Sequence, residues 1–375
     1  MRLNMRASIV WLTALLILPV ALQAQKPRER ELKLPIGGTP GALDAITDVA
    51  GVEVGHTTLV SGTGKLVVGT GPVRTGVTVI HPRGKANSDP VFAAWFTLNG
   101  NGEMTGTTWV QESGMLEGPV AITNTHSVGV VRDAIIQWEV AQKNALQPWW
   151  LPVVAETYDG GLNDINGFHV KPEHVLAALD GASAGLPREG VVGGGTGMVC
   201  HGFKGGVGTA SRAVGGYVVG VLVQANYGRR RRFRVDGVPV GQLIGDRIPG
   251  PTRGDESGSI IGIVATDAPL LPHQCDRLAQ RTGLGVGRMG GTAAHSSGDL
   301  FFAFATGNRE LASEGVIPLE MLSDLELTPF YDAVIESTEE AILNALLAAE
   351  TMTGRDGNTV HALEPELLVE ALRQA

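Results

Sequence analysis

Ser259 has the surroundings that best fit a nucleophile. It opens an apolar run at 260–265 and follows Gly258 at the end of a loop. A serine there is held on a rigid strand end, while the preceding glycine can adopt dihedral angles that other residues avoid. This pattern suits self-cleavage, in which the hydroxyl attacks the Gly258 carbonyl and water frees a chain that begins at Ser259. The new α-amine, with an unperturbed pKa of about 7.7 to 8.0, can serve as a base. On spacing alone, such a serine is more often just the start of a strand.

Other chemical motifs are incomplete. The glycine clusters at 193–197 and 205–208 contain neither a G-x-x-x-x-G-K-[ST] pattern nor the acidic residue that follows a dinucleotide-binding turn. The nine histidines form no H-E-x-x-H, and there is no C-x-x-C, so we expect no metal site. A G-x-S-x-G elbow around Ser259 fails because position 261 is isoleucine. The sequence therefore predicts chemistry without a metal or an organic cofactor.

Composition limits the class of protein. The chain has 375 residues, enough for one large domain or two packed together. Its 52 glycines occur among 43% hydrophobic residues without a G-x-y period, which excludes collagen and disorder and indicates many tight turns. The 29 basic and 38 acidic residues give a net charge of −9, which argues against nucleic acid as a partner. Cys200 and Cys275 are too few for a disulfide scaffold.

Residues 1–24 are typical of a secretory signal peptide. Arg2 and Arg6 precede an apolar run at 9–22, and Leu-Gln-Ala at 22–24 suggests cleavage after Ala24. The alternative, a membrane anchor, is weaker because the run is shorter than the ~20 residues that a bilayer requires. We expect a soluble protein without stable membrane association, either periplasmic or secreted.

Apolar periodicity predicts a mixed α and β architecture for the mature chain. The stretch between 225 and 258, rich in glycine and proline, is interpreted as a long surface loop, and its arginines at 229–232 as a solvated cluster. Cys275 is placed on the buried face of its helix. Strands are expected at 76–80, 150–155, 216–224, 259–266 and 300–306, and helices at 131–144, 172–179, 271–281 and 330–349.

The residues around Ser259 resemble a known family. The stretch 258–274, GSIIGIVATDAPLLPHQ, is similar to the nucleophile region of the DmpA family, which comprises the L-aminopeptidase/D-esterases and β-peptidyl aminopeptidases, self-processing serine hydrolases. Further matching stretches are 46–56, 99–106, 156–160, 205–212 and 297–299, so the resemblance covers nearly the whole mature chain.

The resemblance implies roles for the residues that form the reacting centre. Ser259 matches the nucleophile, and the bond between Gly258 and Ser259 matches the processing site. Ser297 and Asp299 match the family's Ser-x-Glu pair that assists the nucleophile. Aspartate is one methylene shorter than glutamate, so it reaches Ser297 only if the backbone moves inward or a water bridges the gap. Ser297 and Gly298 could alternatively form a simple turn.

The resemblance also implies residues that hold the substrate. Asn226 matches the oxyanion-hole amide, Tyr158 a tyrosine that can bond the same carbonyl, and Glu156 the carboxylate that receives the free amino group of the substrate. Each has a structural alternative: Asn226 as a turn former, Tyr158 as core packing and Glu156 as an ordinary strand-end charge. His201 and His295 could be general bases, although the family's chemistry does not need a histidine.

The resemblance implies a four-layer α/β/β/α sandwich. Residues 25–375 would form a single domain cut into an α-segment, 25–258, and a β-segment, 259–375, assembled as a homotetramer. The expected function is removal of an N-terminal residue from short peptides, amides or esters with a free amine, through an acyl-enzyme on Ser259. Two alternatives stay open: an acyltransferase of the ornithine acetyltransferase type, which uses threonine, and an inactive periplasmic binding protein. The preference among α-L, α-D and β-amino acyl groups is left open.

Overall fold

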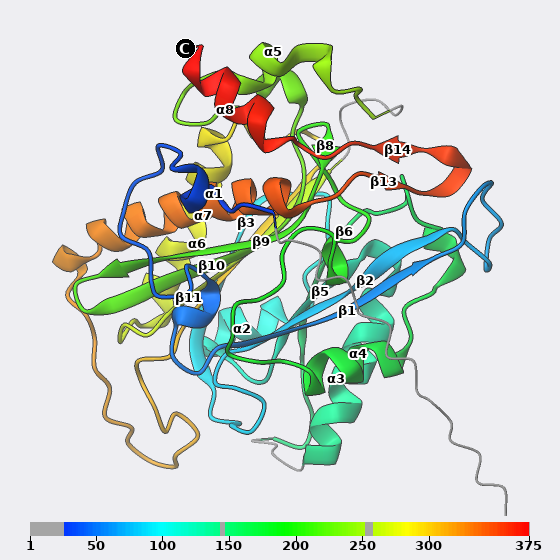
Figure 1. The fold of residues 1–375 in the computed structure, drawn as a ribbon. Coiled ribbons are helices and arrows are strands. Elements are labelled where there is room, and N and C mark those ends of the chain that lie inside the picture. The colour runs from blue at the N-terminus through cyan, green and yellow to red at the C-terminus, as the bar shows by residue number, and fades with distance from the viewer. Residues whose placement is uncertain (1–25, 143–146, 252–257, 375) are drawn as a thin grey trace, which may run out of the picture.

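Two β-sheets lie face to face at the centre of the structure, and helices cover their outer faces (Figure 1). The computed structural model describes residues 26–142, 147–251 and 258–374. The expected signal peptide, 1–24, lies outside the described residues. The layers follow the order helix, sheet, sheet, helix, so the predicted four-layer α/β/β/α sandwich is confirmed.

The larger sheet has six strands in the order β4-β3-β12-β11-β10-β9. The pair β11 and β12 is parallel and the other pairs are antiparallel. Both central strands, β11 and β12, come from residues after 258, and the pair is flanked on one side by β3 and on the other by β10, from the earlier part of the chain. The bounds are Val91–Gly100 for β3, Met115–Leu116 for β4, Gly206–Val214 for β9, Tyr217–Asn226 for β10, Ser259–Thr266 for β11 and Gly298–Ala305 for β12.

The smaller sheet has four strands in the order β1-β2-β5-β6. Its last two strands are parallel, so Glu156 on β6 lies beside Thr123 on β5. The bounds are Glu53–Ser61 for β1, Val73–His81 for β2, Val120–Asn124 for β5 and Val153–Thr157 for β6.

Alternate residues of β11 serve two different cores. Ile261 and Ile263 face the smaller sheet, where they pack in one cluster with Ile122 of β5. Ile260 and Val264 point to the opposite face and join the cluster beneath the helices. A strand buried on both faces shows a continuous apolar run, which is what residues 260–265 display.

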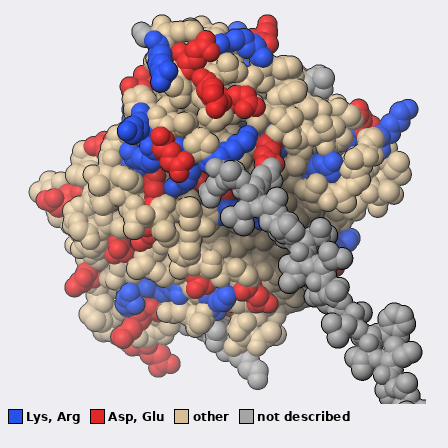
Figure 2. Space-filling view, viewed as in Figure 1, with Lys and Arg blue, Asp and Glu red and all other residues tan. Residues whose placement is uncertain are grey.

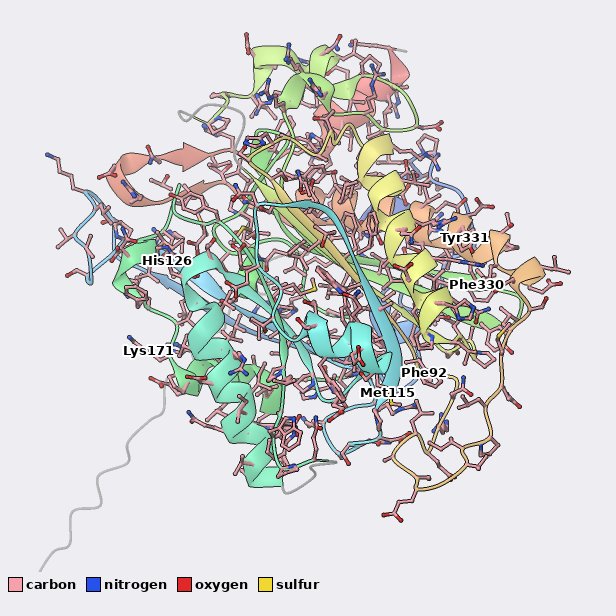
Figure 3. All side chains as sticks on the ribbon, turned by 180° about the vertical axis from the view of Figure 1, so that it is seen from behind. Phe92, Met115, His126, Lys171, Phe330 and Tyr331 are labelled. Atoms are coloured by element: carbon pink, nitrogen blue, oxygen red, sulfur yellow. The ribbon has the colours of Figure 1, made fainter. Side chains whose placement is uncertain are left out.

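The outer helices cover the two sheets separately. Helices α6 (Pro272–Arg288) and α7 (Thr328–Ala348) pack on the larger sheet, and α3 (Val128–Gln142) and α4 (Pro172–Asp180) pack on the smaller one. Cys275 on α6 is fully buried as expected, and its Sγ donates to the Phe92 carbonyl of β3 at 3.7 Å. Figure 3 shows Phe92 beside Met115, its partner across β3 and β4.

The remaining elements are short and connect the layers. Among the described residues, no helix combines the length and the apolar character needed to cross a bilayer. On the face in Figure 2, basic and acidic side chains are interspersed, so neither sign dominates it. The short elements are the helices α1 (Glu29–Leu32), α2 (Thr107–Ser113), α5 (Val240–Ile244) and α8 (Pro365–Arg373), and the strands β7 (Val199–Cys200), β8 (Phe203–Lys204), β13 (Met352–Thr353) and β14 (Thr359–Val360).

Every strand and helix expected from the sequence is present, with ends shifted by up to three residues, except that α6 ends at Arg288, seven residues beyond the expected end. The interpretation of 225–258 as a surface loop was wrong for much of its length. Phe233 and Val235 are fully buried, and Val240 and Ile244 of α5 join the same core as Leu368 of α8. The helical spacing of Val240 and Ile244 extends only over the five residues of α5, which is too short for a sequence period to be recognised.

Candidate active site

Ser259 lies at the head of the central strand β11, between the two strands that contribute its neighbours. Its side chain is 6% exposed, and its Oγ accepts a hydrogen bond of 3.0 Å from the backbone N–H of Gly298 on β12. On the other side, Ser259 is the Cα partner of Asn226, the last residue of β10. The sheet therefore fixes the serine hydroxyl between a backbone donor and an amide side chain.

Gly258 is needed for close packing. A Cβ at this position would lie 2.0 Å from the Asn226 carbonyl oxygen and 3.0 Å from the Tyr227 Cα. The absent side chain lets the chain pass directly against β10 before Ser259.

Asp299 reaches Ser297 directly. The Ser297 hydroxyl donates to Asp299 Oδ1 at 2.6 Å, and the same oxygen accepts from the backbone N–H of Ile260 at 3.2 Å. Burial raises the pKa of Asp299, and the hydrogen bonds from Ser297 and Ile260 partly oppose that rise. Within the described part of the chain, no hydrogen bond joins the Ser297 and Ser259 hydroxyls.

A break in the strand register brings the shorter acid inward. The pairing of β12 with β3 shifts between Asp299 and Leu300, and the Asp299 N–H bonds to the Asn99 side-chain oxygen at 2.8 Å. A bulge re-aims a side chain by bending its strand. Of the two ways in which aspartate could replace glutamate, the structure has the direct contact.

Asn226 and Tyr158 share one hydrogen-bond system. Asn226 Nδ2 donates to the Tyr158 carbonyl at 3.1 Å, and its Oδ1 accepts from the Val199 N–H at 2.8 Å. An amide nitrogen carries two hydrogens, so the second is left to face a ligand. Tyr158 is 41% exposed, which excludes core packing, and a Cβ on Gly160 would lie 2.4 Å from its hydroxyl.

Glu156 is a buried carboxylate at the other side of the serine. Its Oε1 accepts from the Glu103 N–H at 3.1 Å, and Oε2 accepts from the Thr125 hydroxyl. Burial raises the pKa of Glu156, while the Thr125 hydrogen bond opposes this rise. Its Oε1 would lie 3.3 Å from a Cβ on Gly102, so glycine at 102 leaves the carboxylate uncovered on that side.

A cavity of about 110 Å³ opens where these residues meet. Tyr158, Asn226, Gly258, Ser297 and Asp299 all contribute to its lining. Ser259 enters the sheet immediately behind Gly258, and Glu156 lies outside the lining. Five of the seven residues named from the sequence thus face one cavity.

The two histidines considered as bases do not fit that role. His201 is fully buried and packs against Tyr227 and Phe233, and burial lowers its pKa to about 4. His295 is exposed and does not line the cavity. Burial also raises the pKa of Cys200 to about 12, which marks an unreactive thiol. Across the described ranges, no three His, Cys, Asp or Glu side chains gather in a way that could hold a metal.

Sequence reasoning missed three residues that hold the site together. Gly298 supplies the N–H to Ser259, Asn99 receives the Asp299 N–H, and Thr125 donates to Glu156. Asn99 and Gly298 lie within the stretches 99–106 and 297–299, which resemble the family. The resemblance assigned no role to either residue. No feature of the sequence marked Thr125, because its contact with Glu156 depends on the parallel pairing of β5 with β6.

Comparison with known proteins gives consistent matches along the chain. The pattern of peptidase family S58 matches residues 44–360. The beta-peptidyl aminopeptidase BapA of Sphingosinicella microcystinivorans is 53% identical over 366 residues, covering 93% of this chain and 92% of the relative. That of Sphingosinicella xenopeptidilytica is 45% identical, covering 96% and 95%.

Solved structures match over almost the same length. A Burkholderia sp. beta-aminopeptidase has a TM-score of 0.86 and 49% identity, covering 93% of this chain and 99% of the other. The L-aminopeptidase D-Ala-esterase/amidase of Ochrobactrum anthropi, described as a variant of the Ntn hydrolase fold, has a TM-score of 0.86 and 44% identity with the same coverage.

Proposed function

This chain belongs to peptidase family S58 and is an N-terminal-nucleophile serine aminopeptidase, and from that premise we propose how its own residues perform the reaction. The proposal assigns Ser259 as the nucleophile and the Gly258–Ser259 bond as the site of self-cleavage. The observation that carries it is the position of Ser259, whose hydroxyl accepts from the Gly298 N–H and whose strand partner, Asn226, lines the cavity together with Gly258.

Self-cleavage would begin with attack by Ser259 Oγ on the Gly258 carbonyl carbon. The C–N bond breaks as the C–O bond forms, so the peptide becomes an ester and the Ser259 nitrogen becomes a free amine. Water then hydrolyses the ester, which leaves a carboxylate on Gly258 and restores the hydroxyl. The close passage of Gly258 against β10 supports this step, because it holds the bond beside the backbone of Asn226.

Substrate hydrolysis would reuse the same hydroxyl. Ser259 attacks the scissile carbonyl, its α-amine takes the proton, and the second hydrogen of Asn226 Nδ2 and the Tyr158 hydroxyl stabilise the oxyanion. Asp299 accepts a hydrogen bond from Ile260 N, the next amide after Ser259, so its carboxylate lies close enough to favour the ammonium that forms. The scissile C–N bond then breaks, and the amine leaves with the proton that the α-amine took up. Water hydrolyses the resulting ester, which releases the acid and restores the Ser259 hydroxyl.

Glu156 would bind the ammonium group of the substrate. Buried carboxylates usually have a cationic or hydrogen-bonding partner, and the hydrogen bonds that Glu156 accepts within the described residues come from two neutral donors. A Cβ on Gly102 would lie 3.3 Å from Glu156 Oε1 and 3.1 Å from the Gly298 Cα, so the carboxylate lies on the β12 side of the serine. This would hold the substrate amine at a fixed distance from the scissile bond.

The substrate class we propose is short peptides and amides that begin with a β-amino acid. Two relatives, 53% and 45% identical, are beta-peptidyl aminopeptidases, and a beta-aminopeptidase structure is 49% identical. The L-aminopeptidase at 44% identity makes α-L-amino acyl substrates the second candidate.

Maturation and assembly complete the proposal. Residues 1–24 would direct export to the periplasm or beyond and be removed after Ala24. Residues 25–258 and 259–375 would stay together as one domain, supported by the placement of β11 and β12 within a sheet completed by earlier strands. The resemblance further suggests four such units per assembly.

A panel of p-nitroanilides tests the function. We expect the highest kcat/KM for β-alanyl, lower values for L-alanyl and D-alanyl, and no cleavage of N-acetyl-β-alanyl p-nitroanilide. Equal cleavage of the acetylated substrate would contradict an aminopeptidase that binds a free amine. Transfer of the acyl group to an amino acid without hydrolysis would favour the acyltransferase alternative, and absence of both activities the binding protein.

A further inference from the structure

Asp159 is a fully buried carboxylate that follows the exposed Tyr158. Strand β6 ends at Thr157, so both residues lie where the chain leaves the smaller sheet. A buried carboxylate is costly unless hydrogen-bond donors surround it. The reaction assigned to Ser259 and its neighbours does not use this carboxylate.

Neutral donors hold both oxygens of Asp159. Its Oδ2 accepts from Asn124 Nδ2 at 3.0 Å, and its Oδ1 accepts from Asn163 Nδ2 at 3.0 Å. The Thr75 side chain adds a further hydrogen bond. Burial raises the pKa of Asp159 to about 6, and these hydrogen bonds oppose the rise. The orientation of the carboxylate is therefore fixed by the groups around it.

The contact with Asn124 connects the two segments that hold the substrate. Asn124 is the last residue of β5 that pairs with β6. Beyond that pair, the hydrogen bond from Asn124 to Asp159 continues the connection between the two chains. Thr125, the residue after Asn124, donates to Glu156, and Tyr158 is the residue before Asp159. One hydrogen bond thus ties the segment that orients Glu156 to the segment that carries Tyr158.

Asp159 also packs against a residue of the cavity wall. A Cβ on Gly197 would lie 2.6 Å from the Asp159 Cβ, and Gly197 lines the cavity. The Tyr158 carbonyl accepts from Asn226 Nδ2, so Tyr158 is held both through its own carbonyl and through the side chain of the next residue. Asp159 is fully buried and lies outside the lining of the cavity, so it acts on a substrate through its neighbours.

We propose that Asp159 is a positioning residue that sets the distance between the oxyanion site at Tyr158 and the amine site at Glu156. This distance decides which substrates react, because a β-amino acyl group has one more carbon between its amine and its scissile carbonyl than an α-amino acyl group has. Misplacement by about 1 Å in a reacting centre can cost about 100-fold. The inference rests on the proposed function, which supplies the roles of Tyr158 and Glu156.

Asp159→Asn tests this role in the self-processed enzyme, with kcat and KM measured for β-alanyl and L-alanyl p-nitroanilide. The variant keeps the size of the side chain but replaces one acceptor oxygen with an NH₂ group, which then faces the NH₂ group of Asn124 or Asn163. We expect kcat/KM for the preferred substrate to fall by about ten- to 100-fold, and the ratio between the two substrates to move toward one.

A donor–acceptor exchange separates positioning from a general loss of structure. The double variant Asp159→Asn/Asn124→Asp reverses the direction of the same hydrogen bond and should restore both the rate and the substrate ratio. The Thr75 hydroxyl, which accepts from Asn124 Nδ2 at 2.8 Å, can rotate to donate to the new carboxylate.

Asp164→Asn is the matched control. Asp164 is also buried, and its Oδ2 accepts from the Gly69 N–H and contacts His169 Nε2. These contacts lead away from Tyr158 and Thr125, so we expect Asp164→Asn to lower the midpoint of thermal unfolding while keeping the wild-type substrate ratio.

An Asp159→Asn enzyme with the wild-type rate and substrate ratio would overturn the positioning role, as would equal changes in Asp159→Asn and Asp164→Asn or a folded double variant without recovery. If circular dichroism shows that Asp159→Asn does not fold, Asn124→Ala removes the donor from the other end of the contact and decides. It should narrow the same ratio, and an unchanged ratio would overturn the role. Wild type that cleaves no free-amine substrate would instead contradict the proposed function, and this inference with it.

Discussion

Asn226 and Ser259 are the terminal Cα partners of the antiparallel pairing between β10 and β11. Directly opposed residues of such strands have Cβ atoms about 4.5 to 5.5 Å apart on the same face of the sheet. The distance between the amide donor and the hydroxyl is therefore set by strand register, which is more rigid than a loop. A register shift of one residue would turn one of the two side chains to the opposite face.

Asn226→Asp tests the oxyanion role. The variant keeps an oxygen to accept from the Val199 N–H but loses the amide donor. Removal of one oxyanion-hole donor costs about 100- to 1,000-fold in kcat, and we expect a loss of at least this size because the new charge also opposes the oxyanion. Steady-state kinetics would measure it, with thermal unfolding as the check on folding. Full kcat in a folded variant would remove Asn226 from the mechanism.

Asp299→Glu tests whether the direct contact with Ser297 is required. The acid is 1% exposed and its oxygen lies 2.6 Å from the Ser297 hydroxyl, so an added methylene must displace one of them. A displacement of about 1 Å in a reacting centre can cost about 100-fold, and we expect kcat to fall by about ten- to 100-fold. Asp299→Ala should lose more than about tenfold as well. A neutral Asp299→Glu would indicate a water-bridged contact, and a fully active Asp299→Ala a purely structural acid.

Glu156→Gln tests the amine pocket. The variant keeps the shape of the side chain and removes its charge, and a hydrogen bond to a charged group contributes about 1.5 to 3 kcal/mol. The expected loss in kcat/KM is about ten- to 150-fold. Self-cleavage should survive, because the internal bond has no free amine to bind. Glu103→Gln, at an exposed neighbour whose backbone alone bonds to Glu156, is the matched control and should behave as wild type. An equal loss in both variants would contradict the assignment.

Gly258→Ala tests the close passage of the chain before Ser259. Its Cβ would lie 2.0 Å from the Asn226 carbonyl oxygen, so the backbone must move away from β10. We expect self-cleavage to slow by about 100-fold, since misplacement by about 1 Å has that effect. Gly250→Ala adds the same methyl group where no atom of the described residues lies within 4 Å and should leave the rate unchanged. Precursor and fragments can be followed on a denaturing gel over time, and rapid cleavage of Gly258→Ala would show that the close packing is unnecessary.

The sheets were predictable because burial on both faces gives continuous apolar runs. Residues 260–265 displayed such a run, and the helix containing Cys275 showed a buried face at i+3 and i+4 spacing. The stretch 225–258 was misread because its buried residues lie on pieces too short to show a period, such as Val240 and Ile244 of the five-residue helix α5.

The reacting residues could be named from the resemblance, but their arrangement could not. The bulge that brings Asp299 to Ser297 depends on the pairing of β12 with β3, some 200 residues apart along the chain. The contact of Thr125 with Glu156 likewise arises from pairing between β5 and β6. Arg229 and Arg232 line the cavity, although the sequence favoured a solvated cluster for the arginines at 229–232.

Self-cleavage at Ser259 is tested most directly by mass spectrometry of the purified full-length protein and of Ser259→Ala. Wild type should give two fragments, one ending at Gly258 and one whose N-terminal residue is Ser259, whereas Ser259→Ala should remain one chain without aminopeptidase activity. An intact wild-type chain with full activity, or a Ser259→Ala protein that is still cleaved after Gly258, would contradict the account.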